Sequence, residues 1–99
     1  MKYYLKVRPK AIEDISKIAL FYEEKSSGLG KDFILRLDAT IERIKRNPLN
    51  YSRYYKEYHR ALLRRFPIGI FFIVLNDLIS VVSVMDLRQD PNKIKSSLK

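Results

Sequence analysis

The sequence has 99 residues, a length typical of a single domain. It contains no cysteine and one histidine, His59, which excludes disulfides, thiolate metal sites and a histidine-rich metal centre. Its net charge is +9, from 20 basic and 11 acidic side chains. Such an excess indicates an anionic partner, such as nucleic acid, a ribonucleoprotein or an acidic protein segment.

The start of the chain shows no secretion signal, because Lys6 and Arg8 interrupt any apolar segment. The longest apolar run, Ile68–Leu75, is too short to cross a bilayer. We therefore expect a soluble cytoplasmic protein with no membrane partner.

The first half of the chain predicts a strand and two helices. Tyr3–Val7 is rich in residues that favour strands. From Lys10 to about Lys25, and from about Gly30 to Arg46, apolar residues recur at helical spacing. Ser26–Gly30 separates the helices, and Gly28 is the candidate for a left-handed residue that ends the first. So short a turn predicts an antiparallel helical hairpin.

The second half predicts strands. Leu49–Glu57 is interpreted as a loop dense in tyrosine. His59–Arg65, Ile68–Leu75 and Leu78–Met85 are predicted to be strands, and the last two are joined by a tight turn at residues 76–77. Because Ile68–Leu75 is apolar on both faces, it is expected to be central and covered on both sides.

Asn92–Lys99 is interpreted as a basic tail of about one helical turn. The order strand, helix, helix, strand, strand, strand predicts one α+β domain over residues 1–99. We expect an N-terminal strand, a helical hairpin and a three-stranded antiparallel meander, with the helices packed on one face of the sheet.

The densest positive charge immediately precedes the predicted central strand. Residues 43–65 hold eight basic side chains and one acid, a net charge of +7. If His59–Arg65 is a strand, Arg60 and Arg64 point to one face and His59 and Arg65 to the other. Arginine offers a planar fork that matches phosphate or carboxylate, although charge on an edge strand can also serve only to prevent aggregation. For the cluster we favour a binding surface. Its candidate residues are Arg53, Lys56, Arg60, Arg64 and Arg65.

Four tyrosines alternate with these cations, at positions 51, 54, 55 and 58. Their rings could stack bases while the cations hold phosphates, or they could cap the end of the core with their hydroxyls outward. The pattern leaves both interpretations open.

His59 is the one side chain whose ordinary pKa lies near neutrality. As the general base of an RNA cleavage reaction it would need a second proton-transferring group. The sequence offers no obvious carboxylate for that role, so a structural role is favoured. We expect no catalytic residues, no metal and no cofactor.

The layout resembles the toxins of the RelE/ParE superfamily of type II toxin–antitoxin modules, and the ParE branch is the most similar. The motifs that carry this resemblance follow one another along most of the chain. They are A-x-x-D-I from Ala11, Y-E-x-x-S-x-G-L-G-x-x-F from Tyr22, I-x-x-N-P from Ile44, R-x-x-L-x-R-F-P from Arg60, and V-x-D-L-R-Q-D-P ending at Pro91.

The resemblance implies a small basic toxin that arrests growth until a cognate antitoxin binds it. ParE-like members poison DNA gyrase. RelE-like members cut mRNA on the ribosome with basic and aromatic side chains on the sheet. A non-toxic binding module on the same fold is a third interpretation.

Departures from the family pattern favour the ParE branch. Asp86 stands where the family often has histidine, and Gln89 where arginine is common. Gly69 occupies a position where RelE-type nucleases tend to keep an arginine, and Arg88 is the one strong cation left after the last strand. We therefore expect a toxin that binds a protein target, with Arg88 added to the binding residues. For the nuclease alternative, the resemblance implies a site made of His59, Arg60, Arg64, Arg65 and Arg88.

Overall fold

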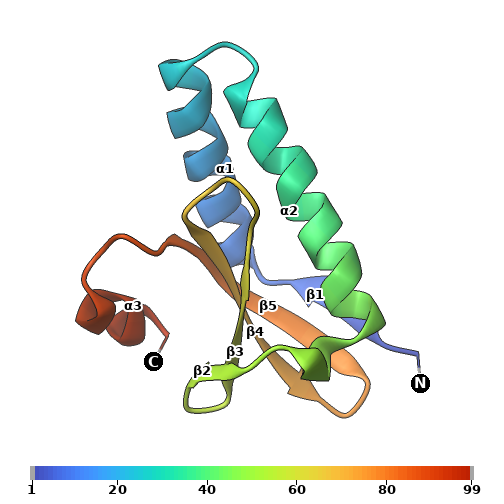
Figure 1. The fold of residues 1–99 in the computed structure, drawn as a ribbon. Coiled ribbons are helices and arrows are strands. Elements are labelled where there is room, and N and C mark those ends of the chain that lie inside the picture. The colour runs from blue at the N-terminus through green and yellow to red at the C-terminus, as the bar shows by residue number, and fades with distance from the viewer. Residues whose placement is uncertain (1, 99) are drawn as a thin grey trace.

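The computed structural model describes residues 2–98. Figure 1 shows a pair of long helices packed on a twisted sheet, with a short C-terminal helix to one side. The elements are, in chain order, β1 (Tyr4–Val7), α1 (Pro9–Lys25), α2 (Leu29–Arg46), the 3₁₀ turn η1 (Pro48–Asn50), β2 (Arg53–Tyr55), β3 (Tyr58–Leu62), β4 (Ile68–Leu75), β5 (Leu78–Asp86) and α3 (Pro91–Ser97).

The five strands form one sheet in the order β1-β5-β4-β3-β2. β1 runs parallel to β5, and the other neighbours are antiparallel. β4 is central and is buried from Ile68 to Phe72, as its uninterrupted apolar sequence predicts. Asn76 and Asp77 form the expected two-residue turn, with Asn76 at a φ of 57°.

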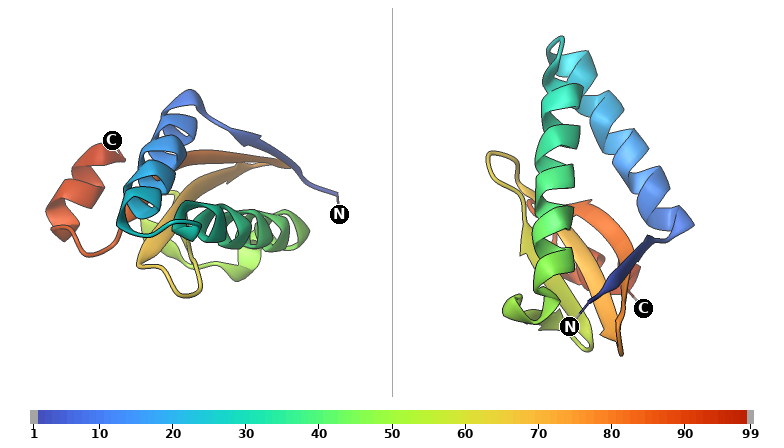
Figure 2. Two further views of the ribbon diagram at one scale, coloured as in Figure 1. Left: turned by 90° about the horizontal axis from the view of Figure 1, so that it is seen from above. Right: turned by 90° about the vertical axis from the view of Figure 1, so that its right-hand side faces the viewer.

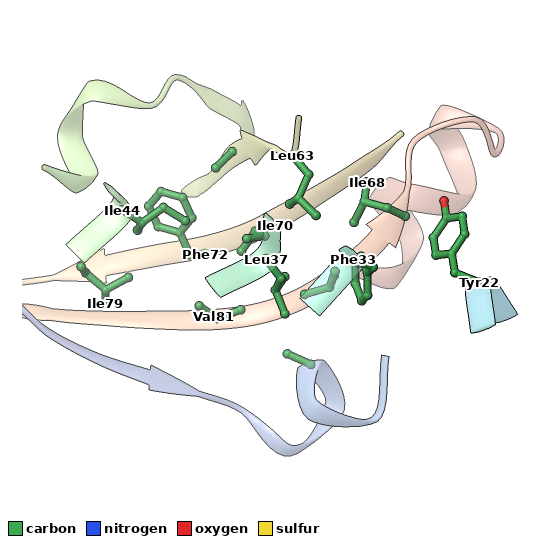
Figure 3. Packing of buried hydrophobic residues seen from close by; sticks show 13 residues of the cluster. Tyr22, Phe33, Leu37, Ile44, Leu63, Ile68, Ile70, Phe72, Ile79 and Val81 are labelled. Atoms are coloured by element: carbon green, nitrogen blue, oxygen red, sulfur yellow. The ribbon is translucent and has the colours of Figure 1, made fainter. Parts of the chain in front are cut away.

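The helical hairpin covers one face of the sheet. Phe33, Leu37 and Ile44 form the buried stripe of α2, and they pack on Ile70 and Phe72 of β4 in one core cluster (Figure 3). The right-hand view of Figure 2 shows that α1 and α2 meet at the tip of the hairpin and diverge toward the sheet. Buried side chains of both helices share one core cluster with apolar side chains of β3, β4 and β5.

The turn of the hairpin follows the glycine pattern. Gly28 has a φ of +87°, so it is left-handed as predicted, but it is the N-cap of α2 and does not end α1, whose C-cap is the extended Ser26. The carboxylate of Glu23 accepts hydrogen bonds from the backbone N–H groups of Gly28 and Gly30, at 3.0 to 3.1 Å. One acid of α1 thus satisfies free donors at the start of α2.

The C-terminal tail forms a seven-residue helix, α3. Its Ile94, with the following Leu98, packs on Phe71 of β4 and Met85 of β5 in a second cluster. Since Phe71 alternates along β4 with Ile70 and Phe72 of the hairpin cluster, α3 covers the opposite face of the sheet.

Two predicted boundaries are wrong. The strand expected over His59–Arg65 ends at Leu62, and the chain turns in the β3–β4 loop, where Arg65 has a left-handed φ of 70° that no strand residue adopts. The segment expected to be a loop, Leu49–Glu57, contains the three-residue edge strand β2.

Among residues 2–98, no helix has the length and apolar character needed to cross a membrane.

Candidate functional site: a basic aromatic surface and a second groove

The guanidinium of Arg60 lies over the ring of Tyr54, with Cζ 4.5 Å from the ring centre. The Tyr54 ring contacts Phe71 edge-on at 5.5 Å, and Phe71 is fully buried under α3. The charged group therefore rests on an aromatic ring that the core holds in place. Gly69 leaves room beside it, since a Cβ atom there would lie 3.4 Å from the Cγ of Arg60.

Further cations lie near the neighbouring ring. The ammonium groups of Lys56 and Lys95 lie 5.3 and 5.7 Å from the centre of the Tyr55 ring. Tyr54 and Tyr55 both pack against the α3-side cluster. Tyr54 and Tyr55 therefore pack against the core, as the capping interpretation predicts, and each ring also lies next to at least one cation. We call this set the Arg60 surface. It consists of Arg53, Tyr54, Tyr55, Lys56, Arg60 and Lys95.

The Arg60 surface includes a hollow of about 520 Å³ beside β2 and β3. None of its four cations forms a salt bridge with any acid in the described part of the chain. The side chains around the hollow include no carboxylate and no imidazole, and they are Asn50, Tyr51, Ser52, Arg53, Tyr54, Arg60 and Leu62.

His59 lies on the other face of β3. Its ring stacks on Phe72 of the hairpin-side core, with centres 5.3 Å apart and planes 16° apart. Its Nδ1 lies 2.7 Å from the carbonyl oxygen of Tyr51 and donates to it. His59 is therefore engaged in the link between η1 and the sheet, away from the guanidinium of Arg60.

Arg64 and Arg65 lie in the β3–β4 loop, so their expected alternation along a strand is wrong. Arg65 lines a second hollow, of about 470 Å³, on the hairpin side of the sheet. Arg64 is exposed and lines neither of these two hollows. The structure therefore separates Arg60 from Arg65, and the three arginines do not form one surface.

Arg88 also lines the second hollow, where it is paired with an acid. Its Nε and Nη2 donate to the carboxylate of Asp86 at 3.1 and 2.7 Å, and its backbone N–H donates at 2.8 Å. The hydrogen bonds from Arg88 lower the pKa of Asp86, and the carboxylate raises the pKa of Arg88. Arg88 is thus oriented by Asp86, and part of its charge is neutralised.

One cation of the Arg60 surface and one of the second hollow are missing from the sequence-based set. Lys95 joins the Arg60 surface through the fold of α3, and Arg36 of α2 joins Arg65 and Arg88. Their sequence signal is weak, because lysine in a basic tail and arginine on a polar helix face are ordinary features of solvated surfaces.

Comparisons with known proteins agree on the class. The structure is similar to a chain of the chromosomal ParDE toxin–antitoxin system from P. aeruginosa, with a TM-score of 0.77 and 16% identity, over 88% of this chain and 98% of that one. It is also similar to a mutant of the E. coli toxin RelE in the free state, with a TM-score of 0.66 and 17% identity, over 98% and 94% of the two chains. A search of curated proteins finds no match. The architecture is thus the α+β fold shared by ParE and RelE structures.

The sequence itself gives the family. Residues 5–91 match the family described as the ParE toxin of the type II toxin–antitoxin system parDE. The chain belongs to this family of ParE toxins. It is the toxin component of a type II module, and a cognate antitoxin is its partner.

Proposed function

We propose that this toxin arrests growth by binding a protein target, DNA gyrase, through the Arg60 surface. Gyrase is the target that resemblance to the ParE branch implies, and the proposal places the toxin in the cytoplasm. One observation supports the proposal. The guanidinium of Arg60 lies over the Tyr54 ring, with Cζ 4.5 Å from the ring centre, beside a hollow whose lining includes no carboxylate and no imidazole. Such a site is built to hold an anionic group and offers no evident general acid–base pair.

Anchoring on the core supports binding at this surface. Tyr54 is fixed against Phe71, and Arg60 is fixed on Tyr54, so less side-chain entropy is lost when a partner carboxylate is bound. The unpaired cations also favour rapid encounter with an acidic protein surface.

The test is gyrase-catalysed supercoiling, titrated with intact toxin. We expect inhibition by the wild type, and inhibition weakened about tenfold or more by Arg60→Ala, on the scale of a hot-spot arginine. Arg64→Ala removes the same charge from an exposed position outside the hollow and is the matched control. Absence of inhibition by wild-type toxin in stoichiometric excess would refute gyrase as the target.

A RelE-like, ribosome-dependent mRNA endoribonuclease is the second candidate. The observation that favours it is the interleaving of cations with Tyr54 and Tyr55 on the sheet, a pattern suited to bases and phosphates. Arg60 would then stabilise charge on the phosphate. His59 is directed to the opposite face and is therefore a poor base for this reaction. Mapping mRNA ends on translating ribosomes tests this candidate, and site-specific cuts that depend on Arg60 would establish it in place of gyrase binding.

A further inference from the structure

The second hollow lies between α2, the β3–β4 loop and the segment after β5, and we call it the α2 groove. Its apolar lining comes from Leu29, Leu35 and Ala39 of α2 and from Phe66 and Pro67 of the loop. Its volume of about 470 Å³ falls within the usual range for ligand pockets. Leu35 is 57% exposed, so a large apolar side chain lies open at the groove.

Positive charge surrounds this apolar space. Arg36, Arg65 and Arg88 line the groove, and Asp32 is the one acid that lines it. Arg88 is paired with Asp86, whereas Arg36 and Arg65 form no salt bridge within residues 2–98. Two free guanidinium groups beside an apolar pocket call for a ligand that carries both apolar and anionic groups.

Arg65 has an unusual backbone conformation. Its φ is 70°, in the left-handed region that a long side chain rarely adopts. The next residue, Phe66, contacts Tyr22 and Phe33 with ring centres 4.9 and 5.8 Å apart, and this packing fixes the loop. Strained residues held by their surroundings are concentrated at ligand clamps and other functional sites. Arg65 thus stands at a position suited to glycine, in a loop that aromatic packing holds beside the groove.

Tyr22 supplies a third observation. It lines the groove, is 7% exposed, and its hydroxyl is buried without a hydrogen-bond partner among the described residues. Figure 3 shows Tyr22 at the end of the core cluster, beyond Ile68 and Phe33. A buried donor left unpaired is costly, so a ligand group that accepted from it would bind favourably.

We propose that the α2 groove binds the cognate antitoxin. A segment of the antitoxin places an apolar side chain between Leu35 and Phe66 and a neighbouring carboxylate against Arg65 and Arg36. The apolar walls and Asp32 disfavour a polyphosphate, whereas charge complementarity favours an acidic, apolar peptide. The proposal rests on family membership, which gives the antitoxin as partner, and it is independent of gyrase as target.

The first test replaces Arg65 in intact toxin and measures affinity by calorimetry for the protein encoded beside the toxin gene. Arg65→Gly suits the backbone, because glycine adopts a φ of 70° without strain. We expect this variant to remain folded and to bind about tenfold or more weakly. Arg64→Ala, in the same loop and with the same change of charge, is expected to bind like the wild type.

The second test adds charge to the apolar wall. Leu35→Glu is expected to weaken antitoxin binding about tenfold or more, because it places a carboxylate in the apolar part of the groove. Leu20→Glu is the matched control, since Leu20 is a helical leucine that is 61% exposed and lies outside the groove. Both positions are open to solvent, so both variants are expected to fold.

The outcomes separate the possible occupants. If Arg64→Ala and Arg65→Gly lower antitoxin affinity equally, the effect is general electrostatics and the proposal is overturned. Wild-type antitoxin affinity in both Arg65→Gly and Leu35→Glu would also overturn it. If Arg65→Gly weakens gyrase inhibition and leaves antitoxin affinity intact, the groove belongs to the target. If Leu35→Glu abolishes only toxin self-association, seen by sedimentation, the groove belongs to a second copy. A failure of wild-type toxin to inhibit gyrase leaves this proposal standing.

Discussion

The backbone carbonyl oxygen of Ala19 lies so close to Gly30 that a Cβ atom on Gly30 would be 2.6 Å away. This contact brings α1 and α2 together near the tip of their hairpin. Gly30→Ala is therefore expected to force the helices apart and to lower the free energy of unfolding by about 1–3 kcal/mol, as overpacking does. Chemical denaturation measures the change.

Gly28 provides the comparison. A Cβ atom there meets nothing within 4 Å, but φ is +87°. Gly28→Ala should cost about 1–2 kcal/mol, from the left-handed backbone alone. A Gly30→Ala protein as stable as the wild type would show that the helices can separate freely at this contact.

The buried hydroxyl of Tyr22 gives a prediction of opposite sign. It has no hydrogen-bond partner within the described residues, and its burial raises the pKa of the phenol further above neutrality. Tyr22→Phe keeps the ring contacts with Phe33 and Phe66 and removes only the unpaired group. Free toxin should therefore be as stable as the wild type, or more stable by up to about 1 kcal/mol. A loss of stability in thermal or chemical unfolding would mean that the hydroxyl is bonded after all.

Much of the fold is predictable because its signals are local. The helical hairpin follows from apolar spacing and from glycine at the turn, and β4 follows from an uninterrupted apolar run. The short strand β2 could not be predicted in this way, because three residues carry no period and the strand exists through its pairing with β3. The same holds for α3, whose position depends on Phe71 and Met85 being left uncovered by the hairpin.

The candidate site was harder to predict for a related reason. Arg60 and Arg65 are close in sequence, but β3 ends between them. The position of the loop that carries Arg65 depends on the packing of Phe66 against Tyr22 and Phe33. These are tertiary contacts, so residue spacing alone could not separate the arginines into two surfaces.

The Asp86–Arg88 pair predicts a dependence of stability on pH. Hydrogen bonds from Arg88 lower the pKa of Asp86 below its ordinary value of 3.8. The stabilisation is therefore present above about pH 4 and is lost as the pH falls through the lowered pKa of the folded state. Both side chains are partly exposed, so solvent screening keeps this contribution small.

Arg88→Ala tests this dependence. The variant should be less stable than wild type at pH 7, and the difference should shrink as the pH falls through the lowered pKa of folded Asp86. Arg64→Ala corrects for the removal of one positive charge from a basic protein. A difference between wild type and Arg88→Ala that does not shrink as the pH is lowered below about 4, after this correction, would show that Arg88 stabilises the fold by packing and not through Asp86.

The contact between the Arg60 guanidinium and the Tyr54 ring predicts how toxicity responds to substitution of the ring. Tyr54→Phe keeps an aromatic face under the guanidinium, whereas Tyr54→Leu keeps bulk and removes the face. If the Arg60 surface engages the target, Tyr54→Phe should arrest growth like the wild type, and Tyr54→Leu should be weaker. Arg60→Lys should also be weaker, because an ammonium lacks the planar fork. Growth after induction without antitoxin measures toxicity, with toxin abundance determined in each culture. Full toxicity of Arg60→Lys and Tyr54→Leu at equal abundance would place the target-binding surface elsewhere on the molecule.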